Sequence, residues 1–175
     1  MSIGVSTDEE IREGHEAPRV AGRASASPAE PVHSWSMEAP FKILEHPADI
    51  GFQAWGRTQA ELFENAALAL FSLSCELATV QESESRTVEV SASGLEDLLY
   101  AWLAELLAIA EGERVVFRRA AVSLVDAERI RATVYGEPLD RSRHRSGTHI
   151  KAITFHQLYV REIPDGWSAQ VFVDL

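Results

Sequence analysis

The sequence predicts an α+β fold with mainly antiparallel sheet and two main helices. Two segments carry apolar residues at helical spacing, and several others alternate apolar and polar residues as strands do. The helices stand apart among runs of strands, without the regular alternation of strand and helix that builds a parallel sheet. The order strand, helix, strand occurs over 41–90 and again over 88–135, which predicts two similar units.

Length and composition are those of a soluble globular protein. Of the 175 residues, 46% are hydrophobic and 25% are charged. No apolar run approaches the roughly 20 residues that span a bilayer, and the N-terminal residues lack the pattern of a secretion signal. We therefore expect a cytoplasmic protein with no membrane contact. The single cysteine, Cys75, excludes an intrachain disulfide, and it predicts a buried, inert thiol.

The first 40 residues differ from the rest of the chain. They are rich in Ser, Ala, Glu, Gly and Pro and show no sustained apolar period. We therefore expect a flexible extension over 1–40 and a folded domain over 41–175. A first strand begins at Phe41, a turn with Pro and Gly breaks it, and a second strand begins at Phe52.

The first helix is predicted from Thr58 to Ser74. Thr58 and Glu61 have the spacing of a capping box, in which side chains at the helix start bond to free main-chain N–H groups. A linker over 79–85 then leads to an alternating strand over 87–92.

The second helix has the most regular pattern in the chain. Apolar residues recur at intervals of three and four over 95–107. Ser93 and Glu96 predict a second capping box. The helix should end at Gly112, because glycine adopts a left-handed cap at the lowest cost.

The remainder of the chain is predicted to be strands and loops. A polar, basic loop over 136–147 interrupts the strands, and Pro-Asp-Gly at 164–166 predicts the turn between the last two. The expected strands cover 115–125, 129–135, 150–161 and 167–173.

Charge narrows the classes of partner. The formal net charge is −11, most of it beyond the predicted extension, and lysine occurs only at Lys42 and Lys151. Proteins that hold phosphate backbones use fields of Lys and Arg, so strong direct nucleic-acid binding is disfavoured. An acidic surface suits a cation, or a basic protein partner such as an enzyme that itself holds nucleic acid.

The common enzyme signatures are absent from the sequence. It contains no Gly-rich phosphate loop, no Ser-His-Asp order with a nucleophile elbow and no Cys/His zinc spacing. Polar residues at the ends of elements remain as candidates, because the core holds them while their side chains reach solvent. These candidates are His46, Asp49, Lys151, His156 and Asp174.

Two carboxylates are close together at the end of the sequence. Asp174 is followed by Leu175, so a side-chain and a terminal carboxylate lie one residue apart. Two such anions repel unless a cation lies between them, and Ca²⁺ binds several oxygen ligands at about 2.4 Å. Asp49 would add a third carboxylate if the first and last strands are neighbours. The alternative is a solvated chain end.

The other candidates also have a structural interpretation beside the functional one. Asp49 suits a turn, and His46 can satisfy main-chain groups at a strand end. Lys151 falls in the predicted strand 150–161, both faces of which are half apolar, so we expect a partly buried lysine with a carboxylate partner. His46 or His156 would serve as general acid or base if the carboxylates held a catalytic metal.

Five separated motifs in one colinear order resemble the archease family, and together they span 41–175. The motifs are Leu-Glu-His-Pro-Ala-Asp-Ile-Gly at 44–51, Phe-Glu-Asn-Ala-Ala at 63–67, Leu-Glu-Asp-Leu-Leu at 95–99 with Trp-Leu at 102–103, Ile-Lys-Ala-Ile-Thr-Phe-His at 150–156, and Val-Asp-Leu at 173–175.

The resemblance implies a fold and a role. The fold is a pair of strand-helix-strand-strand (SHS2-type) units. The role is that of a non-catalytic cofactor of the RtcB-type RNA ligase, which joins RNA ends with GTP and Mn²⁺ in tRNA splicing or RNA repair. The cofactor promotes guanylylation of the ligase histidine and multiple turnover. The resemblance also implies a Ca²⁺ site made by Asp49, Asp174 and Leu175, with Lys151 on the same acting surface.

One departure bears on the implied site. Pro47 stands where the family pattern has threonine, which removes a hydroxyl and a main-chain donor beside the metal turn. Two other functions remain open from the sequence. One is a metal-dependent phosphoesterase or hydrolase that uses the same carboxylates, and the other is a general chaperone or adaptor.

Overall fold

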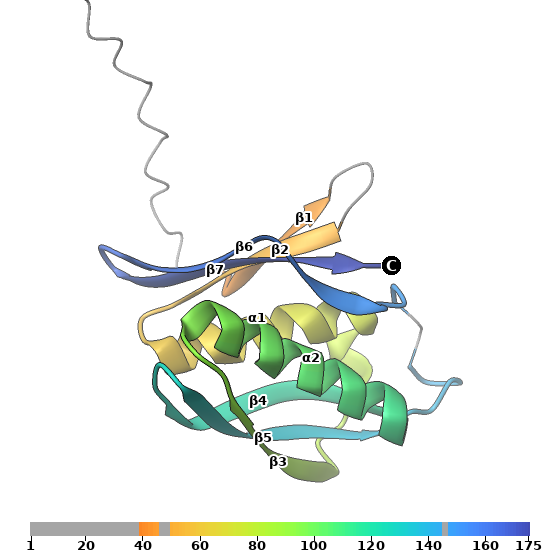
Figure 1. Cartoon of the computed structure of the whole chain (residues 1–175). Helices are drawn as coiled ribbons and strands as arrows, with labels where there is room; N and C mark the ends of the chain where they lie inside the picture. The colour runs from red at the N-terminus through yellow and green to blue at the C-terminus, as the bar shows by residue number, and fades with distance from the viewer. Residues whose placement is uncertain (1–38, 46–49, 145–146) are drawn as a thin grey trace, which may run out of the picture. The chain divides into compact units, whose positions relative to one another are not determined.

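The computed structural model describes residues 39–45, 50–144 and 147–175, and within them two long helices lie between two antiparallel sheets (Figure 1). The predicted α+β class is confirmed. The sheets have the strand orders β1-β2-β7-β6 and β3-β5-β4. The elements are β1 (Phe41–Glu45), β2 (Ile50–Gly56), α1 (Gln59–Ser74), the 3-10 helix η1 (Leu77–Thr79), β3 (Glu84–Ser91), α2 (Leu95–Glu113), β4 (Val115–Val125), β5 (Arg129–Pro138), β6 (Ala152–Ile163) and β7 (Gly166–Asp174).

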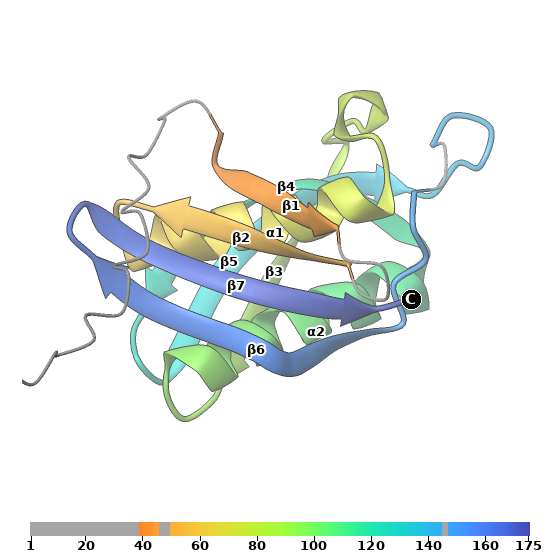
Figure 2. The same cartoon turned by 90° about the horizontal axis from the view of Figure 1, so that it is seen from above.

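The two strand-helix-strand-strand units are interleaved in the chain. One is contiguous, β3-α2-β4-β5, and it is inserted into the other, which consists of β2 and α1 and then β6 and β7. The prediction that 41–90 forms one unit is wrong, because β3 pairs with β5 in the opposite sheet and not with β1 or β2. Figure 2 shows the four-stranded sheet from above, with β7 between β2 and β6.

One hydrophobic core joins both sheets through the helices. Helix α1 contacts β2 and β4, while α2 contacts β6 and β3. Trp102 is fully buried, and its Nε1–H donates to the main-chain oxygen of Phe63 at 3.3 Å. Cys75 is buried as predicted, and burial raises the pKa of its thiol. No helix in the described ranges has the length and apolar character needed to cross a membrane.

The helix ends agree with the sequence prediction in part. The Thr58 hydroxyl accepts a hydrogen bond from the Glu61 N–H at 3.2 Å, as predicted, but the Glu61 carboxylate accepts from the Arg57 N–H at 2.8 Å instead of closing the box on Thr58. The N-cap of α2 is Gly94, with φ 97°, so the predicted Ser93 cap is wrong. The predicted end at Gly112 is also wrong, because Arg114 takes the left-handed conformation.

Strand β6 does not keep the simple alternation expected over 150–161. Its pairing with β7 is irregular between Thr154 and Tyr159, and Gln157 has φ 51°. Ile153 is therefore buried whereas Phe155, two residues later, is 57% exposed. Phe155 stacks on Tyr100 of α2, with ring centroids 4.0 Å apart.

Candidate functional site

The register of the four-stranded sheet brings three chain segments together at one edge. Ile50, which directly follows Asp49 in the sequence, pairs with Val173 of β7. On the other side of β7, Ala152 pairs with Asp174. The last residues of β7 therefore lie between the start of β2 and the start of β6.

Lys151 connects to both of the last two residues. Its main-chain N–H donates to the main-chain oxygen of Asp174 at 2.8 Å, and its Nζ donates to the main-chain oxygen of Leu175 at 2.6 Å. Lys151 is exposed and lies just before β6, so the expectation of a partly buried strand residue is wrong. Its position follows from the antiparallel pairing at the end of β7.

The predicted site residues that the structure describes do not all lie together. Asp174 and Leu175 are exposed next to Lys151. His156 is also exposed, but its ring lies edge-on to Phe172, with centroids 5.8 Å apart. His46 and Asp49 lie outside the described residues, so their place in the site stays a prediction.

The ligand atoms that the structure describes at this edge are oxygens, the type that a hard cation binds. The Asp174 carboxylate and the main-chain oxygen of Leu175 are oxygen ligands, which Ca²⁺ and Mg²⁺ prefer. Within 39–45, 50–144 and 147–175, no three His, Cys, Asp or Glu side chains form a group that could hold a metal ion. A complete cation site here would therefore need ligands from beyond these ranges or from solvent.

A buried ionic cluster that the sequence did not indicate lies at the end of β5. The predicted loop over 136–147 is wrong at its start, because β5 continues to Pro138 and buries Glu137. The Glu137 carboxylate accepts from Arg143 at 2.7 and 3.0 Å and from the Gln81 N–H at 2.7 Å. It also lies 2.9 Å from Nε2 of buried His144.

The protonation of the cluster follows from its hydrogen bonds. The Asp140 N–H donates to Nδ1 of His144 at 3.0 Å, so Nδ1 carries no proton and Nε2–H donates to Glu137. The hydrogen bond from Arg143, followed by that from the Gln81 N–H, lowers the pKa of Glu137 from 4.5 to about 2. The cluster therefore holds an ionised carboxylate that fixes 140–144 to the end of β5.

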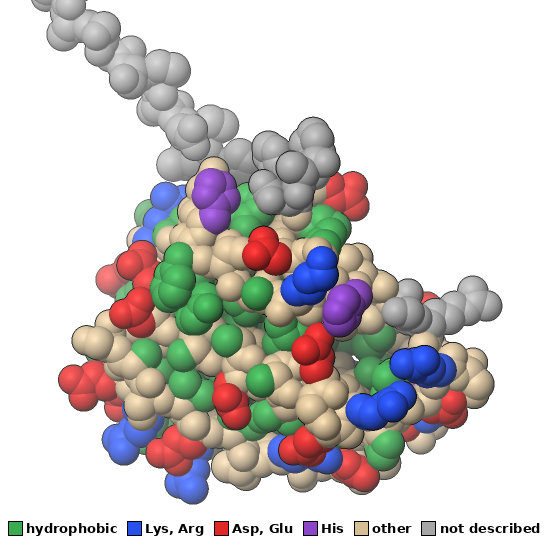
Figure 3. Space-filling model, turned by 45° about the vertical axis from the view of Figure 1, so that its right-hand side comes forward, with side chains coloured by type: hydrophobic (Ala, Val, Ile, Leu, Met, Phe, Trp, Pro, Cys, Tyr) green, Lys and Arg blue, Asp and Glu red, His purple; other side chains and the backbone are tan. Residues whose placement is uncertain are grey.

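Charge is dispersed over the molecular surface near the site. On the face in Figure 3, acidic side chains are scattered among apolar and polar ones, with no continuous field of Lys and Arg. A duplex-binding surface needs such a field to neutralise phosphates. The face in Figure 3 does not present such a field.

Two interleaved strand-helix-strand-strand units with a polar edge at the end of β7 define an α+β protein of the SHS2 type. The Archease protein family (MTH1598/TM1083) matches residues 41–175. The chain is 40% identical to "Protein archease" of Methanosarcina barkeri, over 77% of this chain and 95% of that protein, and 41% identical to that of Pyrococcus abyssi, over 77% and 98%. The chain belongs to the archease family.

Two solved structures have folds similar to this one. Protein 1598 of Methanobacterium thermoautotrophicum is 33% identical, with a TM-score of 0.66, over 78% of this chain and 99% of that one. An archease of Thermotoga maritima, described as a possible chaperone, has a TM-score of 0.53 at 21% identity, over 77% and 96%. The second likeness shows the fold alone.

Proposed function

We propose that this protein is a non-catalytic activator of an RtcB-type RNA ligase in tRNA splicing or RNA repair, acting in the cytoplasm. It promotes guanylylation of the ligase histidine and repeated turnover, and it performs no bond chemistry itself. The acting surface is an acidic site for a divalent cation such as Ca²⁺. The proposed ligands are Asp49, Asp174 and Leu175, with His46, Lys151 and His156 on the surrounding surface.

The observation that carries this proposal is the register at the end of β7. The pairing of Ile50 with Val173 puts the chain that leads to Asp49 beside the chain that leads to Asp174. Consecutive Cα atoms are only 3.8 Å apart. This register supports the proximity of the three proposed ligands, which their separation in sequence does not suggest.

Lys151 supports the proposal through charge. Its ammonium group donates to the main-chain oxygen of Leu175 at 2.6 Å. A positive charge there offsets part of the repulsion among the carboxylates proposed to meet at this edge. A bound cation would supply further positive charge between the carboxylates, while Lys151 holds the last residue in place.

The acidity of the chain suits the proposed partner. A ligase that holds RNA presents basic surface, and a protein of net charge −11 is attracted to it over several ångströms of solvent. The attraction weakens with salt, since the screening length is about 8 Å at physiological ionic strength. We therefore expect activation to decline as salt rises.

The proposal is tested by ligase guanylylation. An RtcB-type ligase that is slow alone is incubated with labelled GTP and Mn²⁺, with and without this protein, and label on the ligase is followed with time. We expect the protein to accelerate labelling. Asp174→Asn should reduce the acceleration roughly tenfold or more, because losing support around a bound metal commonly costs 10- to 100-fold.

A matched control comes from the other end of the same strand. Asp165 lies exposed in the turn between β6 and β7, so Asp165→Asn makes the same change in charge far along the hairpin from Asp174. It should leave activation unchanged. Equal loss in both variants, or a labelling rate indifferent to the wild-type protein across divalent cations, would count against the proposal.

The same protein preparations separate the two alternatives. Metal-dependent turnover of p-nitrophenyl phosphate by the protein alone, lost in Asp174→Asn, would indicate a phosphoesterase. Suppression of aggregation of several unrelated proteins, retained in Asp174→Asn, would indicate a general chaperone.

A further inference from the structure

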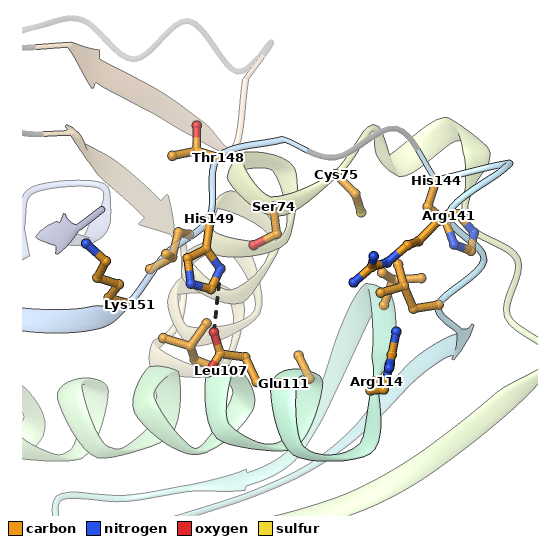
Figure 4. A pocket seen from close by; sticks show the side chains of 14 residues that line it. Ser74, Cys75, Leu107, Glu111, Arg114, Arg141, His144, Thr148, His149 and Lys151 are labelled. Atoms are coloured by element: carbon orange, nitrogen blue, oxygen red, sulfur yellow. Dashed lines mark ion pairs between the residues drawn. The ribbon is translucent and has the colours of Figure 1, made fainter.

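A pocket of about 770 Å³ lies beside Lys151, on the side of it away from the four-stranded sheet (Figure 4). The C-terminal ends of α1 and α2 form one wall. The described lining residues of the other wall are Leu139, Arg141, His144 and residues 148–151. This volume is in the range of pockets for small organic ligands.

The charge of the pocket is opposite to that of the chain. A protein of net charge −11 here presents three Lys or Arg side chains, two histidines and a single acidic side chain among the described lining residues. Buried His144 is already hydrogen-bonded to Glu137. The carboxylate of Glu111 lies 3.8 Å from Nδ1 of His149. The ionisable side chains of the lining are Glu111, Arg114, Arg141, His144, His149 and Lys151.

Two arginines are directed at the pocket by their backbones. Arg114 ends α2 in the left-handed conformation, and its main-chain oxygen accepts from the Leu139 N–H at 2.8 Å. Arg141 follows Asp140, whose carboxylate accepts from Ser142 and whose main-chain oxygen accepts from His144. Figure 4 shows Arg141 reaching in from above and Arg114 from below.

The ionic cluster around Glu137 explains which arginine in this segment is available. Arg143 is engaged by Glu137 at 2.7 Å, and this contact anchors the segment to β5. Arg141, two residues earlier, reaches into the pocket (Figure 4). The fold thus uses one arginine for structure and directs the other to solvent inside the pocket.

The C-terminal ends of α1 and α2 disfavour the binding of an anion in the pocket, but only weakly. The negative ends of α1 and α2 face this region. However, the Ser74 and Leu73 oxygens accept from the Gly147 and Thr148 N–H groups, at 3.0 and 2.8 Å. These carbonyls are therefore satisfied, and the full charges of the two guanidinium groups outweigh the partial charges of the helix ends.

The pocket also has an apolar floor. Leu107 and Ala110 of α2, Val116 of β4 and buried Ile150 line it below the charged rim. A free inorganic anion makes no use of apolar surface, whereas a ligand with a flat organic body gains by covering it. Two guanidinium groups beside an apolar floor suit a ligand that carries a phosphate on an organic group.

We propose that this pocket binds the phosphate group of a small organic phosphate the size of a nucleoside monophosphate. Arg114 and Arg141 bind the phosphate oxygens through guanidinium N–H donors, and the organic body lies on the half-buried Leu107, Ala110 and Val116. The site is separate from the proposed carboxylate site, with Lys151 between the two, and it does not depend on the proposed role in RNA ligation.

The test is calorimetric titration of the full chain with AMP, adenosine and inorganic phosphate. We expect saturable AMP binding that is tighter than binding of either inorganic phosphate or adenosine. Arg141→Ala and Arg114→Gly should each weaken AMP binding about tenfold or more, as the loss of hydrogen bonds to a charged group does. Arg114→Gly keeps the fold, because glycine takes the left-handed conformation freely.

Arg131→Ala is the matched control, since Arg131 is exposed on β5 and pairs with Glu89 at 3.5 Å outside this pocket. It should bind AMP as the wild type does. Absence of saturable binding at millimolar AMP, or equal binding by all three variants, would overturn the proposal. Equally tight adenosine would overturn the phosphate contact, and equally tight inorganic phosphate would overturn the role of the apolar floor.

Discussion

At the scale of single residues, Glu137 shows how a buried charge is accommodated. Its carboxylate accepts hydrogen bonds from Arg143, from the Gln81 N–H and from His144, so burial leaves it with partners on several sides. An unpaired carboxylate in this position would be strongly disfavoured. The cluster therefore favours one conformation of the segment that carries Arg141.

The cluster predicts a particular dependence of stability on acid. The folded state lowers the pKa of Glu137 from 4.5 to about 2, so its contribution to the free energy of unfolding is full above pH 4.5 and is lost as pH falls toward 2. In Glu137→Gln, stability at neutral pH should fall, and its decline between pH 4.5 and pH 2 should be shallower. Urea unfolding midpoints measured over this range check both.

Glu128→Gln is the control, because Glu128 is exposed in the turn before β5. Its midpoints should decline with acid as steeply as those of the wild type. Equal slopes for Glu137→Gln and the wild type would show that the ionic cluster does not stabilise the fold.

At the scale of elements, the local sequence specifies that α2 is a helix, whereas contacts with other segments of the chain determine where it ends. The apolar spacing over 95–107 predicted the helix itself, because burial on one face needs only the helical period. The ends depend on other segments: β4 begins at Val115, directly after Arg114, whose main-chain oxygen is bound by the Leu139 N–H. No local pattern reveals a partner 25 residues further along the chain.

The two glycines of α2 should therefore respond in opposite ways to substitution. Gly112 lies inside the helix, and a Cβ there would meet nothing within 4 Å. Gly112→Ala should raise the free energy of unfolding by about 0.5 to 1 kcal/mol, because alanine loses less backbone entropy in a helix. Thermal unfolding followed by far-UV circular dichroism measures the change.

Gly94 gives the matched comparison. It too has open space around a new Cβ, but its φ of 97° is strained for any other residue. Gly94→Ala should lower the free energy of unfolding by about 1 kcal/mol or more. If both variants moved in the same direction, backbone conformation would not be the cause.

At the scale of the whole molecule, the sequence predicted the class of fold better than its connections. Period and turn residues located nearly every element, since these signals are local. The pairing of β3 with β5 was missed, because a strand's partner is chosen by packing across the core. For the same reason the pocket basic residues Arg114 and Arg141, which lie in separate loops, were not recognised as a pair.

At the candidate site, too, the sequence predicted the residues better than their surroundings. Asp174, Leu175 and Lys151 were named from the sequence, and their contacts follow from the antiparallel register of β6 and β7. The expected burial of Lys151 was wrong, because β6 begins at Ala152, two residues later than predicted, and leaves the lysine at the sheet edge. Sequence alternation gives the faces of a strand only where the pairing stays regular, and β6 does not meet this condition.

Because both sheets pack on the same two helices, we expect the domain to unfold in one cooperative transition. Trp55 and Trp167 report on the four-stranded sheet through fluorescence and Trp102 reports on the core, while far-UV circular dichroism follows every element. The two urea transitions should coincide in the wild type. Separate midpoints would mean that the two sheets unfold independently.

A substitution of Trp102, at the centre of the core, tests whether the two sheets unfold together. Trp102→Ala removes a fully buried indole that also donates to the main chain of α1 at Phe63, so it should cost about 3 to 5 kcal/mol. Tyr100→Ala, on the same helix but at a half-buried position, should cost less. If the core is shared, Trp102→Ala shifts the fluorescence and dichroism midpoints together, since losing the contact between α1 and α2 weakens the packing of both sheets at once.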